Sequence, residues 1–523
     1  MSAVGSPAGG VGSRRNRWAT LEWLSRSPAS RISWISERNI TLSHGKTLME
    51  GSYSRRDFLR GGAAASVAAL APLAGCMVFD GGSSLGEGNP ANAGATSIDT
   101  DVATALDPSA YEDRFSNVVD ITDDPYNADP SGEEPIGDAL SMAWEDDTLI
   151  VFPQGEYKMN QGFRRTGWRD VGLIGQNAVI RHGEVEAIHG HTVDEGEYRG
   201  GTMLFRLGTF NSPHEGELVF GGFIFDWSRE NSGMRGLYAI INDRAEIRNI
   251  AFAGLHDLGS HGNMRVATSS PDAFARVSSV DMSGGGMHYG DTINTRETTD
   301  YAGDTNEEGL GQSWSTTGIV GHTDMQGTTL FENCICGPWP DNGMYVQGGG
   351  RQIIRNCIAS NSGTANFRFN STDEWDPIPE LDENENGELT RDGTYPTSTV
   401  ENSIAIVDRQ PSGTYESGRS IWHYSGEGLI RDCEIVISHE DDAGGPGGNF
   451  AIGARSGVTE STIENCQITL QAPADAFYSG TSAPVTLRNV DIVAEGWDAG
   501  SAPTDVMDGQ TPTLEDVTLN GSS

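Results

Sequence analysis

The sequence predicts an all-β solenoid, in which short strands wind in coils that stack on one another. The first observation is a repeated phrase: residues 332–335 read Glu-Asn-Cys-Ile, and residues 355–358 read Arg-Asn-Cys-Ile, 23 residues further along. The second is that the strand-like pieces 343–346 and 366–369 stand at the same offset. A period of this length, with Gly, Asn and Ser between short β segments, is typical of stacked coils rather than separate globular domains.

The N-terminal part resembles an export signal. Residues 54–59 read Ser-Arg-Arg-Asp-Phe-Leu and an Ala-rich apolar run over 61–73 follows, which together resemble the twin-arginine signal. The run is too short for a membrane-spanning helix. It ends in Leu-Ala-Gly-Cys, which resembles a lipoprotein cleavage box and implies a lipid anchor on Cys76. The alternative is an ordinary cleaved signal with a chance cysteine. We expect the twin-arginine machinery to place the protein on the outer face of the cytoplasmic membrane, or outside the cell.

Three further boundaries follow from composition. Residues 1–48 carry several arginines and little acid, unlike the rest of the chain, so we interpret them as a non-native upstream extension and 49–76 as the signal. Residues 77–111 are rich in Gly, Ser, Asp and Ala and are predicted to be a flexible tether. The remainder, 112–523, is predicted to be a single domain.

The start of this domain resembles a known cap. A strand is predicted over 118–121 and a short amphipathic helix over 135–144, with Ile136, Leu140 and Ala143 on one face. The segment 147–157 then contains Val-Phe-Pro-Gln-Gly-Glu-Tyr. This order resembles the N-terminal cap of pectate-lyase-like β-helices, and the resemblance implies a right-handed parallel β-helix with a short capping helix.

The coils can be counted from the repeated phrase, in which an aliphatic and a polar residue precede an Asn, Asp or Ser. The count predicts about 10–12 coils, with insertions near 290–316 and 371–398. The recurrent polar residue is predicted to be a structural turn residue. It occurs at Asn249, Ser279, Asn333, Asn356, Asn402, Asp432, Asn465, Asn489 and Asp516.

Four of the five cysteines after Cys76 hold one register of the phrase, and Cys336 lies two residues after the first of them. Residues in one register form a column in stacked coils, so we predict an inward stack of thiols. A zinc site is the competing interpretation, but no Cys-x-x-Cys pair is present. Disulfides would need a close Cα approach that sequence does not reveal. The four are Cys334, Cys357, Cys433 and Cys466.

A second phrase, a strand that often begins with Gly, predicts a row of outward side chains. Alternation along each strand sends one residue inward and the next outward. The predicted inward residues are Met264, Met287, Ile319, Met344, Phe367, Ile421 and Phe450. The predicted outward row is Arg265, His288, Val320, Tyr345, Arg368, Trp422 and Ala451.

The resemblance to pectate-lyase-like β-helices implies polysaccharide binding along such a row. For a lyase it implies Arg368 or Tyr345 as the base, with His288 and Arg265 as charge partners. Trp422 and His322 would bind the sugar chain. For a glycosidase, paired carboxylates are needed, and Asp341 and Asp324 are the nearest candidates. The diagnostic motifs of neither class are present. The function therefore stays open between a polysaccharide lyase or hydrolase and a non-catalytic adhesion or scaffold protein.

The second insertion contains a partial calcium-loop pattern. Residues 382–387 match its first six positions, with Asp382, Asn384 and Asn386 as ligands. Position twelve is Gly rather than Glu, although Asp392 is adjacent. The sequence therefore predicts a Ca²⁺ site here, with a chance match in an acidic chain as the alternative.

The charge excludes one class of partner. The formal net charge is −40, and only two of the 34 basic residues are lysines, Lys46 and Lys158. This composition resembles proteins of halophilic archaea, whose carboxylate-covered surfaces stay hydrated in strong brine. Nucleic acid is not expected as a partner, because no basic patch is present to contact phosphates.

Overall fold

The computed structural model describes residues 104–183, 203–230, 232–257, 262–287, 316–321, 324–370, 381–383, 389–391, 397–409, 418–439, 449–495 and 507–522. All belong to one compact unit, Ala74–Ser523. Within them, no helix is long and apolar enough to span a membrane. The signal, Cys76 and residues 77–103 of the predicted tether lie outside these residues. Residues 104–111 of the predicted tether instead pack on the domain through the buried Leu106 and Tyr111, so the folded domain begins before the predicted residue 112.

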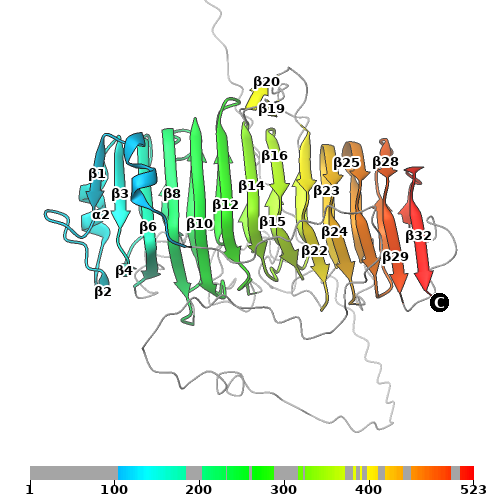
Figure 1. Ribbon diagram of the computed structural model, residues 1–523, viewed down its shortest axis with the longest axis horizontal. Helices are drawn as coiled ribbons and strands as arrows, with labels where there is room; N and C mark the ends of the chain where they lie inside the picture. The colour runs from blue at the N-terminus through cyan, green and yellow to red at the C-terminus, as the bar shows by residue number, and fades with distance from the viewer. Residues whose placement is uncertain are drawn as a thin grey trace, which may run out of the picture. The chain divides into compact units, whose positions relative to one another are not determined.

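The described strands form a right-handed parallel β-helix, as predicted. Figure 1 shows the strands stacked in chain order, from cyan at one end to red at the other. Three parallel sheets run along the stack, and seven long strands bend so that each serves two sheets. We call the sheets A, B and C, in the order in which one coil passes through them.

Sheet A contains β5 (Phe163–Arg165), β7 (Met203–Leu207), β9 (Arg235–Ile241), β11 (Met264–Thr268), β13 (Ile319–Val320), β15 (Asn342–Val346), β18 (Ala365–Asn370), the first parts of β23 (Arg419–Arg431) and β25 (Phe450–Glu464), β27 (Asp475–Ser479) and β30 (Met507–Gly509).

Sheet B contains β1 (Asn117–Asp120), β3 (Thr148–Phe152), the first parts of β6 (Arg169–His182), β8 (Glu215–Trp227), β10 (Arg244–Gly254), β12 (Phe274–Met282) and β14 (Thr328–Cys336), then β16 (Arg351–Arg355), β21 (Ser398–Glu401), the ends of β23 and β25, β28 (Val485–Arg488) and β31 (Thr513–Glu515).

Sheet C contains β2 (Ser131–Pro135), β4 (Glu156–Met159), the ends of β6, β8, β10, β12 and β14, then β17 (Ile358–Ser360), β22 (Ile404–Val407), β24 (Glu434–Ile437), β26 (Gln467–Leu470), β29 (Asp491–Glu495) and β32 (Thr518–Ser522).

The corner between sheets B and C explains the recurrent Asn or Asp. All nine predicted turn residues have φ between 46° and 58°, the left-handed region that Asn and Asp adopt at lower cost than most residues. Asn489 also donates its side-chain amide to Asn465 Oδ1 of the preceding coil at 2.8 Å. The phrase is therefore structural, as predicted. In two earlier coils this corner is formed by Asn177 and Gly222, which also have positive φ but are not preceded by the repeated phrase.

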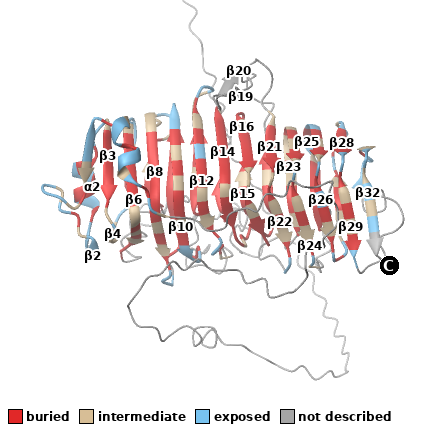
Figure 2. Ribbon diagram, viewed as in Figure 1, coloured by how far each residue is buried: buried red, intermediate tan, exposed pale blue. Residues whose placement is uncertain are grey.

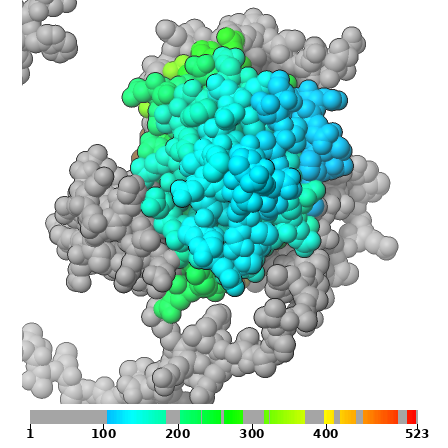
Figure 3. Space-filling model, turned by 90° about the vertical axis from the view of Figure 1, so that its left-hand side faces the viewer, coloured from blue at the N-terminus to red at the C-terminus, as the bar shows by residue number. Residues whose placement is uncertain are grey.

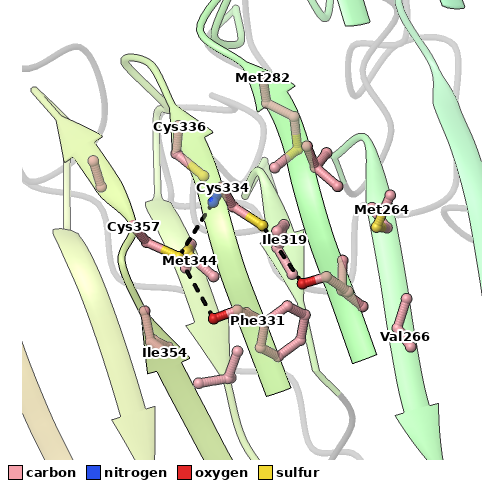
Figure 4. Close-up of a cluster of buried hydrophobic side chains, with 14 of the residues drawn as sticks. Met264, Val266, Met282, Ile319, Phe331, Cys334, Cys336, Met344, Ile354 and Cys357 are labelled. Carbon is pink, nitrogen blue, oxygen red and sulfur yellow. Dashed lines mark hydrogen bonds between the residues drawn. The ribbon is translucent and has the colours of Figure 1, made fainter. Parts of the chain in front are cut away.

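The cysteines fill the interior, as predicted. Cys334, Cys336, Cys357, Cys433 and Cys466 are all buried and unpaired. Figure 4 shows the Cys334 backbone N–H directed at Cys357 Sγ, 3.4 Å away, among Met264, Phe331 and Met344. Burial raises the pKa of the Cys336, Cys357 and Cys433 thiols. The described residues contain no group of three or more His, Cys, Asp or Glu side chains arranged to hold a metal.

The N-terminal end is capped. Helix α2 spans Gly137–Ala143, inside the predicted range, and buries Ala139, Leu140 and Ala143. Two 3₁₀ turns, η2 (Pro108–Ala110) and η3 (Glu112–Arg114), precede it. Figure 3 shows residues of this N-terminal part covering the end of the stack. Figure 2 shows the strands of the stack largely buried, whereas β32 at the other end is partly exposed.

The predicted insertions fall in different connections of the coil. The first joins β12 of sheet C to β13 of sheet A, and most of it lies outside the described residues. The second joins β18 of sheet A to β21 of sheet B and contains an antiparallel hairpin, β19 (Leu381–Glu383) with β20 (Leu389–Arg391). A further long connection, between β6 and β7, was not predicted.

Candidate functional site

One column of side chains runs along the outer side of sheet A, and we call it the sheet A row. The strand register places five predicted members on successive rungs, from Arg265 through Val320, Tyr345 and Arg368 to Trp422. Their inward neighbours Met264, Ile319, Met344, Phe367 and Ile421 are fully buried. The complete row is Arg164, Arg206, Tyr238, Arg265, Val320, Tyr345, Arg368, Trp422, Gly453, Tyr478 and Asp508.

Two predicted members of the row, His288 and Ala451, are not in it. Arg265 pairs directly with Val320, so no rung between them is left for His288. The segment before His288 instead forms an isolated bridge between Gly286 and His256. His288 itself lies outside the described residues, as does His322. The Gly-led phrase at 286–289 was therefore mistaken for a strand of sheet A.

The register of the β25 coil was also predicted two residues out. Gly453 occupies the row, and Ala451 is buried in the main core. Phe450, predicted to point inward, packs against the rings of Trp422 and Tyr478, with centroids 6.2 and 5.5 Å away. A Cβ at Gly453 would lie 2.5 Å from the Phe450 ring. The aromatic ring thus fills the space that the glycine leaves.

The middle of the row is built around Arg368. Its guanidinium carbon lies 4.0 Å from the Tyr345 ring centroid, 3.9 Å from that of Tyr424 and 5.3 Å from that of Trp422. Tyr424 also lies in this group because of a β-bulge. Phe369 pairs with His423 and Asn370 pairs with Ser425, so Tyr424 is an extra residue in β23 that has no partner in β18. Arg455 lies 4.0 Å from the Tyr424 centroid. We call these five residues the central cluster.

A buried carboxyl group lies beside the central cluster. Asp341, in the turn before β15, is 1% exposed and accepts a hydrogen bond from Thr317 Oγ1 at 3.0 Å. Burial raises the pKa of Asp341 to about 7, although the positive charge of Arg368 opposes the shift. Burial also raises the pKa of Tyr345, which Arg368 lowers and Asp341 raises further. The three groups are therefore electrostatically connected.

Asp324 is not equivalent to Asp341. It is exposed in a turn before the buried Met325, whereas Asp341 is enclosed. The two carboxylates predicted for a glycosidase thus occupy different environments. Two other carboxyl groups do interact electrostatically, at the far end of the row. There, burial and then the charge of Asp508 raise the pKa of Asp475 to about 6. That pair was not predicted.

A second group of arginines surrounds Tyr238, and we call it the N-terminal cluster. The guanidinium carbons of Arg206, Arg265 and Arg235 lie 5.2, 5.8 and 5.9 Å from the Tyr238 ring centroid. Only Arg265 was predicted from sequence. Alignment of apolar–polar–apolar triplets, such as Phe205-Arg206-Leu207 with Leu237-Tyr238-Ala239, would have found Arg206 and Tyr238, but the coil of Arg206 lacks the Asn phrase that marks the period.

Of the predicted calcium ligands, Asp382 alone lies within the described residues. Asp382 lies in β19, opposite Thr390, while Asn384, Asn386 and Asp392 lie outside the described residues. Calcium binding here stays a prediction.

A comparison with known protein families identifies the signal. Residues 52–72 match the model of the TAT (twin-arginine translocation) pathway signal sequence, so the chain carries a signal for export across the cytoplasmic membrane. No curated protein sequence matches the chain.

Three solved structures share the fold at low similarity. The catalytic unit of a thermostable GH87 α-1,3-glucanase from Streptomyces thermodiastaticus strain HF3-3 is 12% identical, with 78% of this chain and 69% of that chain covered and a TM-score of 0.37. The Dettilon tailspike protein is 11% identical, with 77% and 68% covered and a TM-score of 0.29. Escherichia coli YbhC is 10% identical, with 65% and 82% covered and a TM-score of 0.25. These likenesses concern the fold alone.

Proposed function

We propose that this exported protein binds an anionic polysaccharide along the sheet A row. The observation that carries the proposal is the sequence of guanidinium groups and aromatic rings on the outer side of one sheet, in a chain whose net charge is −40. Guanidinium groups form paired hydrogen bonds with carboxylates and sulfates. Flat aromatic rings offer large apolar faces with a polar edge, on which a sugar ring can pack.

The negative net charge of the chain strengthens the argument that this positively charged row binds an anion. A strongly acidic surface repels a polyanion, so binding requires a local concentration of positive charge. The central and N-terminal clusters together contain five arginines, Arg206, Arg235, Arg265, Arg368 and Arg455. Arg368 contacts three rings, and its positive charge also acts on the buried Asp341 beside the central cluster.

Cleavage at the central cluster is a second proposal, favoured by Asp341. A carboxyl group with a pKa of about 7 can accept or donate a proton near neutral pH. The raised pKa of Tyr345 keeps its phenol protonated, which suits a proton donor better than the base role predicted from sequence. Arg368 keeps its proton as well and suits a uronate carboxylate.

These roles fit an elimination. The proton next to the uronate carboxyl group passes to Asp341, its electron pair forms a carbon–carbon double bond, and the glycosidic carbon–oxygen bond breaks. The leaving oxygen takes the Tyr345 proton, while Arg368 neutralises the uronate charge that develops.

The test is a binding titration of the exported protein against polygalacturonate, alginate and the neutral glucan dextran, at two salt concentrations. We expect binding of a polyanion but not of dextran, and a loss of at least about tenfold in Arg368→Ala, roughly the value of one charge-assisted contact. Arg276→Ala is the matched control, because Arg276 is half exposed and paired with Glu332 on sheet B. Unchanged affinity in Arg368→Ala would contradict the proposed site.

Turnover separates the two proposals. Ultraviolet absorbance of an unsaturated uronate, lost in Asp341→Asn and Tyr345→Phe, would support elimination. New reducing ends without that absorbance would favour hydrolysis. Binding without either product would leave a non-catalytic glycan-binding protein, and no binding to any glycan would favour the adhesion or scaffold function.

The lipid anchor is a separate proposal, supported by the lipobox-like sequence 73–76 that directly follows the matched signal. Replacement of Cys76 by Ser should release the exported protein from the membrane fraction, and continued membrane association of that variant would contradict the anchor.

A further inference from the structure

We infer that the N-terminal cluster is a second anion-binding subsite and that one polymer chain occupies it together with the central cluster. This inference rests on the proposed function and adds a length requirement to it. Three guanidinium carbons lie within 6 Å of the single Tyr238 ring, at 5.2, 5.8 and 5.9 Å.

The cluster is held from below and reaches the surface at its edge. Arg235 is 1% exposed and donates Nε–H to the Gly262 carbonyl oxygen at 3.3 Å, which fixes its guanidinium. Arg206 and Arg265 are half-buried and belong to the sheet A row itself. Two arginines of the row thus flank a tyrosine on consecutive rungs, with a third positive charge behind them.

An apolar wall borders this cluster on the outer side of sheet A. Tyr238 and Ile240 pack with neighbouring coils in a hydrophobic group that is separate from the main core. The residues between and beside them, Leu237, Ala239 and Ile241, point into the main core instead. The outer group contains Met203, Tyr238, Ile240, Ala267 and Met325, with the partly buried Phe210 against it. The five buried members of this wall are at most 9% exposed, so the wall supports the cluster, and the half-buried Arg206 and Arg265 are the groups that an anionic ligand can reach.

The two clusters stand at a fixed distance along the stack. Three register steps separate Arg265 from Arg368, through Val320 and Tyr345. Because neighbouring strands are about 4.8 Å apart, the two guanidinium rungs are about 14 Å apart along the axis. Val320 is buried and carries neither charge nor ring, so the positive rungs fall into two groups.

Affinity should therefore depend on chain length in two stages. A short oligosaccharide reaches one cluster only, whereas a chain longer than about 14 Å engages both and gains from the high effective concentration of its second anionic group. We expect the affinity to rise by at least about tenfold once the oligomer spans both clusters.

The test is a titration with size-separated anionic oligosaccharides of the polymer that binds, using the wild-type protein, Arg206→Ala and Arg368→Ala. Arg206 lies two register steps beyond Arg265. Arg206→Ala should therefore weaken binding of chains long enough to reach it by up to about tenfold, leave the shortest binding oligomers unaffected, and reduce the length step. Arg206→Lys, which keeps the charge, should retain part of the step. Arg276→Ala should behave as wild type, and thermal unfolding should be unchanged in each variant used.

The outcomes separate the two proposals. If Arg368→Ala weakens binding but Arg206→Ala does not, or if affinity rises smoothly with length, the second subsite is wrong and the proposed function stands. If neither variant weakens binding, the proposed function fails as well. An equal loss at all lengths in Arg206→Ala would show one extended site without two subsites, and would also overturn the inference.

Discussion

Two faces of the same coils use arginine in opposite ways. On sheet B, from Glu332 to Glu515, the residue before the corner alternates between acid and base from coil to coil. Arg355 Nε lies 2.5 Å from Glu401 Oε1, and Arg488 Nε lies 2.7 Å from Glu515 Oε2. On sheet A, the arginines of the row pack against Tyr and Trp rings. The alternating residues are Glu332, Arg355, Glu401, Arg431, Glu464, Arg488 and Glu515.

This difference assigns the arginines of sheet B to stability and those of sheet A to binding. Along sheet B each arginine of the ladder pairs with a carboxylate of an adjacent coil, so the ladder holds neighbouring coils together and presents little net charge outward. Along sheet A a cation over an aromatic ring keeps its charge, because the ring has a quadrupole but no net charge. The same residue type therefore contributes to cohesion on one face and forms a candidate ligand site on the other. Substitutions on sheet B should therefore change the unfolding free energy, and substitutions in the sheet A row should change polysaccharide affinity.

The largest effect should be the opposite pH dependence of the two buried carboxyl groups. The pKa of Asp341 is raised from 3.8 to about 7, so the folded state binds this proton more tightly than the unfolded state. Its contribution is full below pH 3.8 and is lost as the pH rises through about 7. Relative to Asp341→Asn, the wild type should lose up to about 4 kcal/mol of unfolding free energy across this window.

Glu401 should show the reverse. Burial works to raise its pKa, but hydrogen bonds from Arg355 and Arg431 outweigh burial, and the net shift is downward. Its stabilisation is therefore present above its ordinary pKa of 4.5 and is lost as the pH falls. Denaturant titrations of Asp341→Asn and Glu401→Gln between acidic and neutral pH check both signs. Parallel pH profiles of the two variants would contradict the distinction between the faces.

At neutral pH, Glu401→Gln should lower the unfolding free energy by about 2 kcal/mol, because two arginines lose one nearly buried partner. Glu515→Gln is the matched control at the exposed end of the same ladder and should cost less than about 0.5 kcal/mol. Neither variant should change polysaccharide affinity by more than about twofold. A large loss of binding in Glu401→Gln would show that sheet B also contributes to the site.

Sequence predicted the parts of the molecule that a local rule determines. The corner residues were found because a left-handed backbone selects Asn and Asp, and the row from Arg265 to Trp422 was found because alternation and register are both periodic. Prediction failed where local rules do not decide pairing. The phrase before His288 has the composition of a strand but joins its neighbour by a single bridge. The burial of Asp341 and its link to Arg368 arise only when separate coils stack.

The smallest effect should come from the end of the row. Asp508 follows Tyr478 in the register, and it raises the pKa of Asp475 in addition to the effect of burial. A carboxylate pair at this end should repel a polyanion, so the positive part of the row ends before it. Asp508→Asn should therefore increase the affinity for the anionic polymer by at most about twofold, with the gain reduced by added salt. Glu515→Gln in the same last coil makes the same change of charge on sheet B and should leave the affinity unchanged. Equal gains in both variants would mean that net charge, rather than position on sheet A, governs binding at this end.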